Sequence, residues 1–279
     1  MTQTVLVTGA SGGVGRAVAQ RFRNDGATVL AGYRDPAAVH ALVAMGCQPV
    51  RLDVTDESDL MAAIKDAPDI DVLVNAAGVS QGGPLEELPL AALRRQFEVN
   101  VLGALRTAQL VAPGMRLRGH GRIINVSSVA GRITFPGMGA YAMSKHALES
   151  MSQALRHELK PFGIGVSVIQ PGGIDTPFAE AERRTYLHGL PEGPYAEFTV
   201  EVIERLSHNP APLSADKVAR TILRAATARH PKGQYRVGTI AHVMLGLHDA
   251  LPGRLWDRLL PMMAPTPKLM PKPASAPKP

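Results

Sequence analysis

The chain has little that could form cross-links or hold a metal ion. Cys47 is the only cysteine among 279 residues, so neither an intramolecular disulfide nor a cysteine-based metal site is possible. The nine histidines lack the spacing of metal ligands. This composition fits a reducing compartment, and we expect a protein without a structural or catalytic metal.

Long apolar runs and blocks of like charge are also missing. No stretch of about 18 apolar residues predicts a membrane span, and a first strand near Thr4 leaves no room for a secretory signal; we expect a cytoplasmic protein. The net charge of +6 is spread along the chain, and only 4% of residues are aromatic. This pattern indicates a solvated surface and no nucleic-acid partner.

What the chain does contain is a regular alternation of short apolar runs with amphipathic segments. Apolar runs occur at 4–8, 28–33, 50–54, 72–75, 121–127 and 165–170, with a further edge strand expected at 234–237. This alternation predicts a doubly wound parallel α/β sheet of about seven strands with helices on both faces. Ligands of such sheets bind outside the carboxyl ends of the strands.

The pattern predicts one domain over residues 1–260. We expect a substrate lid at 178–213, where prolines interrupt the pattern on either side of a helix over 195–207, and C-terminal helices at 240–260. Residues 261–279 are rich in Pro and Lys and predict a flexible tail.

A glycine-rich loop directly follows the first strand. The loop reads Gly9-Ala-Ser-Gly-Gly-Val-Gly15, and an amphipathic helix begins after it. Strand, glycine loop and helix together are typical of dinucleotide binding, because the glycines admit a pyrophosphate to the backbone at a helix N-terminus. The alternative for the glycines alone is an ordinary tight turn.

The residues after the second strand bear on which dinucleotide binds. Arg34 comes first and could accept the 2′-phosphate of NADP(H), with Ser11 adding a hydrogen bond; this favours NADP(H) over NAD(H). Asp35 could hold a ribose or cap a helix that begins at Pro36. Asp53, after the third run, could accept from adenine or belong to a turn. For Arg34 the alternative is a solvated surface residue.

Four polar residues are candidates for proton transfer. Tyr141 and Lys145 are four residues apart and share a helix face, where a lysine can lower the pKa of a phenol. Ser128, at a strand end, can donate to the same substrate oxygen. Asn100 interrupts a helix expected over 88–117; it predicts an irregularity and a buried amide holding a relay water, or otherwise an exposed or core-satisfied asparagine.

The C-terminal third bears on the substrate and on surfaces. The lid contributes apolar and aromatic side chains, which favour an apolar substrate: Phe178, Tyr186, Leu187, Leu190, Tyr195 and Phe198. Residues 240–263 have apolar side chains at helical spacing, which indicates packing on the domain or on another subunit. The alternative is a helix on a membrane surface, with Arg254 and Arg258 on its polar side.

Taken together, these motifs resemble those of the short-chain dehydrogenases/reductases. Thr8-Gly9-x-x-x-Gly13-x-Gly15, Asn75-Ala-Ala-Gly78, Ser128, Tyr141-x-x-x-Lys145 and Pro171-Gly172 stand in the family's order. The resemblance implies a Rossmann-type fold with Asn100, Ser128, Tyr141 and Lys145 as catalytic residues, Ser128 being selected over Ser127 by its thirteen-residue distance from Tyr141. It implies these cofactor contacts: Gly9, Ser11, Gly13, Val14, Gly15, Arg34, Asp53, Val54, Asn75, Ala76, Gly78, Tyr141, Lys145, Pro171, Gly172, Ile174 and Thr176.

The resemblance also implies an activity. We expect an NADP(H)-dependent oxidoreductase that transfers a hydride between nicotinamide and a carbonyl or secondary alcohol, with Tyr141 as general acid/base. The extended C-terminus and Arg34 are similar to members acting on steroids, retinoids or other lipophilic alcohols and ketones. A homodimer or homotetramer built on residues 102–117 and 141–160 is expected. The alternative is a dinucleotide-sensing protein that kept the fold without the chemistry.

Overall fold

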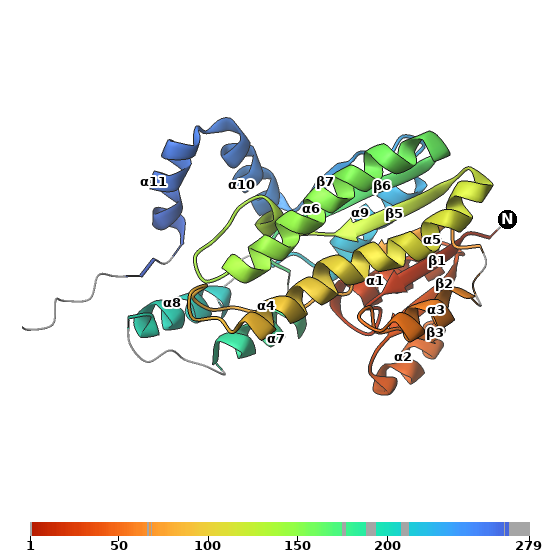
Figure 1. Ribbon diagram of the computed structural model, residues 1–279, viewed down its shortest axis with the longest axis horizontal. Helices are drawn as coiled ribbons and strands as arrows, with labels where there is room; N and C mark the ends of the chain where they lie inside the picture. Colours follow the sequence, from red (N-terminus) through yellow and green to blue (C-terminus); the bar gives the residue numbers. More distant parts are fainter. Residues whose placement is uncertain are drawn as a thin grey trace, which may run out of the picture.

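The structure is a computed structural model, and it describes residues 2–65, 67, 69–174, 177–187, 194–207, 212–264 and 266–267. Its centre is one sheet of parallel strands in the order β3-β2-β1-β4-β5-β6-β7 (Figure 1), as the alternation predicts. The strands are β1 (Thr4–Thr8), β2 (Thr28–Tyr33), β3 (Gln48–Arg51), β4 (Val72–Asn75), β5 (Gly121–Val126), β6 (Ile164–Pro171) and β7 (Gln234–Val237).

Helices cover both faces of the sheet because successive side chains of a buried strand point to opposite sides. In β1, Val5 and Val7 pack with Phe22 on one face, whereas Leu6 packs with Leu60 and Val111 on the other. The first face is covered by α1 (Gly13–Asn24), α2 (Val39–Ala44) and α9 (Ala215–Thr227). The second is covered by α3 (Glu57–Lys65), α5 (Ala104–Arg118) and α6 (Gly139–Leu159).

The helix expected over residues 88–117 is divided by an irregular stretch around Asn100. It consists of α4 (Leu90–Phe97), the π-helical segment η2 (Glu98–Gly103) and α5. Three short 3₁₀ turns are described: η1 (Pro36–Ala38) precedes α2, η3 (Val129–Gly131) precedes α6, and η4 (Lys160–Phe162) follows α6. π-Helical turns occur often at functional sites, and this one brings Asn100 inward.

The remaining helices lie at the end of the molecule where the strands have their carboxyl ends (Figure 1). The segment expected to be irregular contains α7 (Pro177–Leu187) as well as α8 (Ala196–Ser207). The prediction missed α7, although a proline at the first helical position, here Pro177, sacrifices no intrahelical hydrogen bond.

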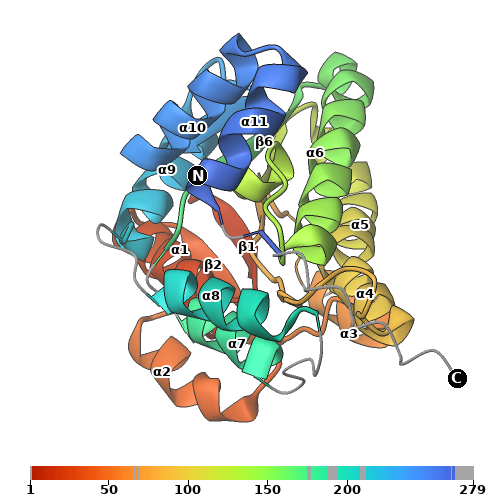
Figure 2. The same ribbon diagram turned by 90° about the vertical axis from the view of Figure 1, so that its left-hand side faces the viewer.

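The C-terminal helices pack onto the domain and onto each other. They are α10 (Thr239–Ala250) and α11 (Gly253–Met263), next to each other in Figure 2. Trp256 and Leu245 are buried with Ile133, so these helices pack on the domain, as their apolar spacing indicates. Helix α11 includes Pro261 and ends at Met263, so the tail boundary expected at residue 261 falls inside a helix. Among the described residues, no helix is long and apolar enough to cross a membrane.

Candidate active site

The crevice for a ligand lies where the strand order reverses, between β1 and β4. Thr8 and Asn75 end these strands in the same register. The Thr8 Oγ1 accepts hydrogen bonds of 3.1 Å from the backbone N–H groups of both Ala76 and Ala77. The two strand-end loops are therefore held side by side at the mouth of the crevice.

Two glycines of the first loop are required by close backbone approach. A Cβ at Gly9, whose φ is +66°, would lie 2.8 Å from the Cα of Ala77. A Cβ at Gly15 would lie 2.2 Å from the carbonyl oxygen of Gly9. Both distances are shorter than any carbon side chain tolerates, so helix α1 can start this close to the loop only with glycine at these positions.

The N-terminus of α1 fits the pyrophosphate of a dinucleotide. Gly12 is its N-cap and supplies no side-chain hydrogen bond, and the first turn contains no acidic residue. Ser11 and Gly12 are exposed, and Gly13 and Val14 are half-buried. The first backbone N–H groups of the helix therefore have no side-chain acceptor and can bind an anion, assisted by the helix dipole.

At the end of β2 the structure separates the two candidates for ribose or phosphate recognition. Asp35 Oδ1 accepts from the Ala37 N–H at 2.9 Å and caps η1, which is the capping alternative. Arg34 is exposed beside it. The side chain of Asp53 accepts from Thr55 N and Oγ1 at 3.0 and 2.7 Å. Burial alone would raise the pKa of Asp53, but the Thr55 hydrogen bonds and the charge of Arg34 lower it.

Tyr141 and Lys145 stand in the first turns of α6, and the Lys145 side chain reaches the end of β5 and the turn after β4. Only 8% of Tyr141 and 5% of Lys145 is exposed. The Lys145 ammonium donates to the carbonyl of Val126 at 2.8 Å and lies 5.6 Å from the centre of the Tyr141 ring. Burial lowers the pKa of Lys145 to about 8, against the charge of Glu149, which raises it. The predicted pair is thus brought together as one buried unit.

Asn100 is buried in η2, and both its amide oxygen and its amide nitrogen have hydrogen-bond partners. Its Oδ1 accepts from the Val79 N–H at 2.8 Å, and its Nδ2 donates to the Val79 carbonyl at 2.8 Å and to Ser144 Oγ at 3.0 Å. A Cβ at Gly78 would lie 3.4 Å from Asn100 Oδ1 and 3.9 Å from Lys145 Nζ. Asn100 and Lys145 therefore flank Gly78. This is the core-satisfied arrangement, and the relay water stays a prediction.

The two serines after β5 differ in their surroundings. Ser128 is half-buried and caps η3, its Oγ accepting from the Ala130 N–H at 3.1 Å, which leaves its own hydroxyl hydrogen to donate to a substrate oxygen. Ser127 is 2% exposed and lies against the position of Gly131, away from solvent. These surroundings support Ser128 as the residue that contacts substrate.

The remaining predicted contacts gather at the same edge, with one outside the described residues. Pro171 ends β6, the Gly172 N–H donates to the Val237 carbonyl at 3.3 Å, and Ile174 forms a bridge with Leu213. Val54 is buried against Gly103 of η2. Thr176 lies outside the residues that the structure describes. All the cofactor contacts named from the sequence, Val54, Ile174 and Thr176 among them, stay predictions.

Sequence reasoning missed several polar residues that support the site. Asn75 Nδ2 donates to Asn125 Oδ1 at 2.9 Å, and Asn125 Nδ2 donates to Ser152 Oγ at 2.8 Å. Ser144, which holds Asn100, donates to the Tyr141 carbonyl at 2.8 Å. The sequence contains one signal for this network. An asparagine stands near the end of each of two apolar runs, and the structure pairs these residues, Asn75 and Asn125, across β4 and β5.

Comparison with known proteins agrees with this arrangement. Residues 3–187, more than half of the chain, match the family model for short chain dehydrogenases. The chain belongs to the short-chain dehydrogenase/reductase family. It is accordingly an oxidoreductase that acts on CH–OH groups with NAD(P).

Curated relatives match this dehydrogenase over almost its whole length. The oxidoreductase YbbO of Escherichia coli is 35% identical over 268 residues, which cover 93% of this chain and 94% of YbbO. The 3-ketodihydrosphingosine reductase of Bacteroides thetaiotaomicron is 31% identical over 244 residues, covering 87% of this chain and 90% of that protein.

Solved structures show the same similarity in three dimensions. A short-chain dehydrogenase from Streptomyces avermitilis superposes on this dehydrogenase with a TM-score of 0.79 at 33% identity, covering 93% and 95% of the two chains. A short chain dehydrogenase from Burkholderia cenocepacia in complex with NADP has a TM-score of 0.76 at 27% identity, covering 93% and 98%.

The Gly15–Gly9 contact generates a first prediction. Gly15→Ala places a Cβ against the Gly9 carbonyl and should weaken NADPH binding by more than about tenfold, because the loop must move away from the α1 N-terminus. Gly12→Ala is the matched control, since nothing lies within 4 Å of a Cβ at that position. NADPH fluorescence titration measures both. Equal affinities of the two variants would contradict the role of this contact.

Proposed function

We propose that this protein is an NADP(H)-dependent oxidoreductase that interconverts a carbonyl and a secondary alcohol on a lipophilic substrate. The observation that carries the proposal is the buried Tyr141–Lys145 pair, placed at the crevice where the glycine loop of β1 meets the turn after β4. Gly9, Gly13, Gly15 and the α1 N-terminus would hold the pyrophosphate, with Asn75, Ala76, Gly78, Pro171 and Gly172 as the further predicted contacts. Bound nicotinamide supplies or accepts the hydride.

Tyr141 is assigned the proton transfer. A phenol has an ordinary pKa of about 10, and an adjacent ammonium stabilises the phenolate form. Lys145 provides that charge and is held in place by the Val126 carbonyl. Ser128 would donate to the substrate oxygen and fix its distance from Tyr141, while Asn100 keeps the backbone of Gly78 and Val79 in position. Phe178 covers Tyr141 from the lid, with ring centres 6.0 Å apart.

Arg34 supports NADP(H) as the preferred dinucleotide. Its side chain is exposed at the end of β2, where the 2′-position of the adenosine ribose would lie. Asp35, which could otherwise favour NAD(H), already accepts from Ala37 as a cap. The relative from Burkholderia cenocepacia was solved with NADP. These observations together favour a 2′-phosphate over a free hydroxyl.

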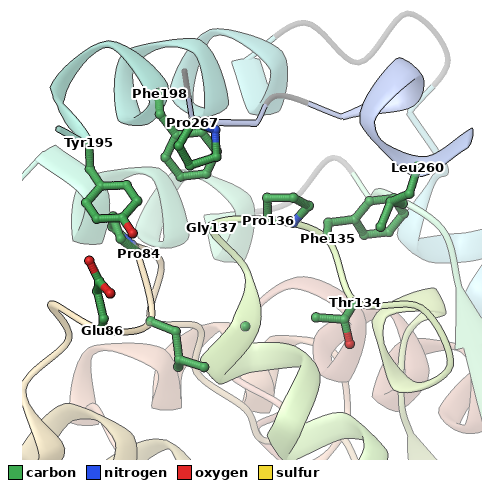
Figure 3. A pocket seen from close by; sticks show the side chains of 12 residues that line it. Pro84, Glu86, Thr134, Phe135, Pro136, Gly137, Tyr195, Phe198, Leu260 and Pro267 are labelled. Atoms are coloured by element: carbon green, nitrogen blue, oxygen red, sulfur yellow. The ribbon is translucent and has the colours of Figure 1, made fainter. Parts of the chain in front are cut away.

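A cavity of about 600 Å³ supports a lipophilic substrate. It lies between the loop before α6, the loop after β4, helix α8 and the end of α11 (Figure 3). Its lining is mainly apolar: Pro84, Leu85, Phe135, Pro136, Phe198, Leu260 and Pro267. Tyr141 does not line it, but Gly139, two residues before Tyr141, does. The cavity would therefore hold the part of the substrate farther from the reacting carbon.

The polar side chains of the cavity are arranged at its edge. Figure 3 shows Tyr195 and Glu86 pointing toward each other, and their hydrogen bond raises the pKa of Tyr195. The bond joins the segment before α8 to the loop after β4.

The 3-ketodihydrosphingosine reductase among the relatives acts, by its name, on a ketone, which supports a carbonyl substrate here.

The assembly and the membrane contact stay predictions. Leu102, Leu117 and Met143 are exposed on η2, α5 and α6, where a homodimer or homotetramer would pair its long helices. Ile240 and Val243 are exposed on α10, and the basic Arg254 and Arg258 are exposed on α11. A purely nucleotide-sensing role is not favoured, because a sensor has no need of the buried Tyr141–Lys145 pair.

Tyr141→Phe tests the proton-transfer role. Removing the hydroxyl should lower kcat by about 10²- to 10⁴-fold, the usual contribution of general acid–base catalysis, while NADPH affinity changes little. Tyr235→Phe is the control, because the hydroxyl of Tyr235 accepts from the Lys232 N–H and lies in the core around β7. The measurement is the turnover of ketones and alcohols, followed by NADPH absorbance. Full activity of the Tyr141→Phe variant would contradict the proposed mechanism.

Arg34→Leu tests the cofactor preference. A charged hydrogen bond to a phosphate is worth about 1.5–3 kcal/mol, so the ratio of kcat/KM for NADPH to that for NADH should fall about 10- to 100-fold. Arg95→Leu, on the exposed side of α4, should leave the ratio unchanged. A wild-type enzyme that prefers NADH would overturn the assignment of Arg34.

A series of 2-alkanones of increasing chain length tests the apolar cavity. Burying each CH₂ contributes about 0.8 kcal/mol, so kcat/KM should rise about fourfold per carbon until the cavity is filled. Leu85→Asp, at the half-exposed edge of the cavity, should flatten this dependence. Leu90→Asp, an exposed leucine on α4 outside the cavity, should retain it. No dependence on chain length in the wild type would argue against the lipophilic substrate.

A further inference from the structure

A buried carboxylate lies one helical turn beyond the catalytic lysine. Glu149 follows Lys145 by four residues on α6, so both project from the same face, and only 8% of Glu149 is exposed. A buried carboxylate is strongly disfavoured without partners that compensate its charge. Neither the family motif nor the proposed mechanism uses this residue, and its burial therefore needs an explanation.

The hydrogen-bond partners of Glu149 are amides, not cations. Its Oε1 accepts from Gln170 Nε2 of β6 at 3.0 Å, and its Oε2 accepts from Gln234 Nε2 of β7 at 3.3 Å. Among the described residues, no lysine, arginine or histidine forms an ion pair with it within 4.0 Å. The hydrogen-bond partners of this buried carboxylate are therefore neutral amide groups.

The carboxylate also lies directly against the turn that carries Ser128. A Cβ at Gly131 would be 3.0 Å from Glu149 Cγ and 3.2 Å from its Oε1, as well as 2.6 Å from Ser127 Oγ. Gly131 is the last residue of η3, which Ser128 caps. Glu149 thus lies against the serine turn, and Lys145 precedes it by one turn of α6.

The charged groups around this carboxylate are few. Its charge raises the pKa of Lys145 and of Arg156, both on α6, each of which burial lowers. Arg156 is occupied by the carbonyls of Val166 and Gly233, at 2.9 and 2.7 Å. Strands β6 and β7 present the amides of Gln170 and Gln234 to it, and the η3 side presents Gly131 and Ser127. Lys145 in turn faces the Tyr141 ring and the Val126 carbonyl.

We propose that Glu149 is a positioning residue of the active site, whose buried charge keeps Lys145 in its ammonium form during proton transfer and whose side chain supports the Ser128 turn. The inference rests on the proposed function for its catalytic consequence. Burial without a counter-charge would favour neutral lysine, and a neutral amine would no longer stabilise the phenolate of Tyr141. The amides of Gln170 and Gln234 hold the carboxylate in this position.

Titration of Lys145 in the Glu149→Gln variant tests the electrostatic part without requiring turnover. Protein labelled with ¹³C at lysine Cε is titrated by NMR, with the Lys145 signal assigned by its absence in Lys145→Met. The pKa of Lys145 should fall by about one unit in Glu149→Gln. Glu158→Gln, an exposed glutamate on the same helix, should leave it unchanged. An unchanged Lys145 pKa in Glu149→Gln overturns the proposal.

The pH profile of carbonyl reduction tests the catalytic consequence. Because Lys145 must be protonated, lowering its pKa moves the basic limb of kcat/KM to lower pH: activity should fall about tenfold at pH 9 and scarcely at pH 6. An equal loss at every pH with an unmoved limb would mark Glu149 as merely structural and overturn the proposal. If the wild type is inactive on all carbonyls and alcohols while the NMR shift is present, the proposed function fails and the effect of Glu149 on Lys145 stands.

Glu149→Asp keeps the test decisive should Glu149→Gln fail to fold. Aspartate retains the charge on a side chain one carbon shorter, so the pKa of Lys145 should fall by less than in a neutral variant and the basic limb should move only slightly. A Lys145 pKa identical to that of the wild type despite this withdrawal would contradict the electrostatic role. Thermal unfolding of each variant shows whether the fold is retained.

Discussion

Two backbones meet at the ends of β1 and β4 with no room for a side chain between them, and the site depends on this contact. Gly9 lies against Ala77, and Gly15 lies against Gly9. Thr8 ties the two loops together through the N–H groups of Ala76 and Ala77. Because this contact brings the N-terminus of α1 and the turn of residues 75–78 to one crevice, a dinucleotide can contact both at once.

Around this contact, buried polar side chains form chains of hydrogen bonds that orient the proposed catalytic residues. One chain of hydrogen bonds links β4, β5 and α6 through Asn75, Asn125 and Ser152. A second chain links η2 to the start of α6 through Asn100, Ser144 and the Tyr141 carbonyl. Buried polar groups are stable only when they find partners. Asn100 lies in the π-helical segment η2, and its side chain forms hydrogen bonds with the backbone N–H and carbonyl of Val79.

Lys145 shows how burial and charge act together in this protein. Removal from water lowers its pKa to about 8, which weakens the ammonium that the proposed proton transfer needs. The charge of Glu149 raises this pKa, and the Glu149 carboxylate accepts hydrogen bonds from amides of β6 and β7. The sheet edge far from the nucleotide loop thereby influences the proton at Tyr141. The mainly apolar cavity reaches α6 at Gly139, two residues before Tyr141.

The sequence by itself determined the features that are local or periodic. The order of strands and helices, the glycine loop, the Tyr141–Lys145 spacing and the interruption at Asn100 all follow from patterns within about twenty residues. The tertiary structure decided the rest. It made Asp35 a cap, formed α7 in a segment that lacked a clear pattern, and extended α11 past Pro261. It also brought Glu149 to Gln170 and Gln234, residues 21 and 85 positions away. Pairings at such separations come from strand order and register, which no local pattern encodes.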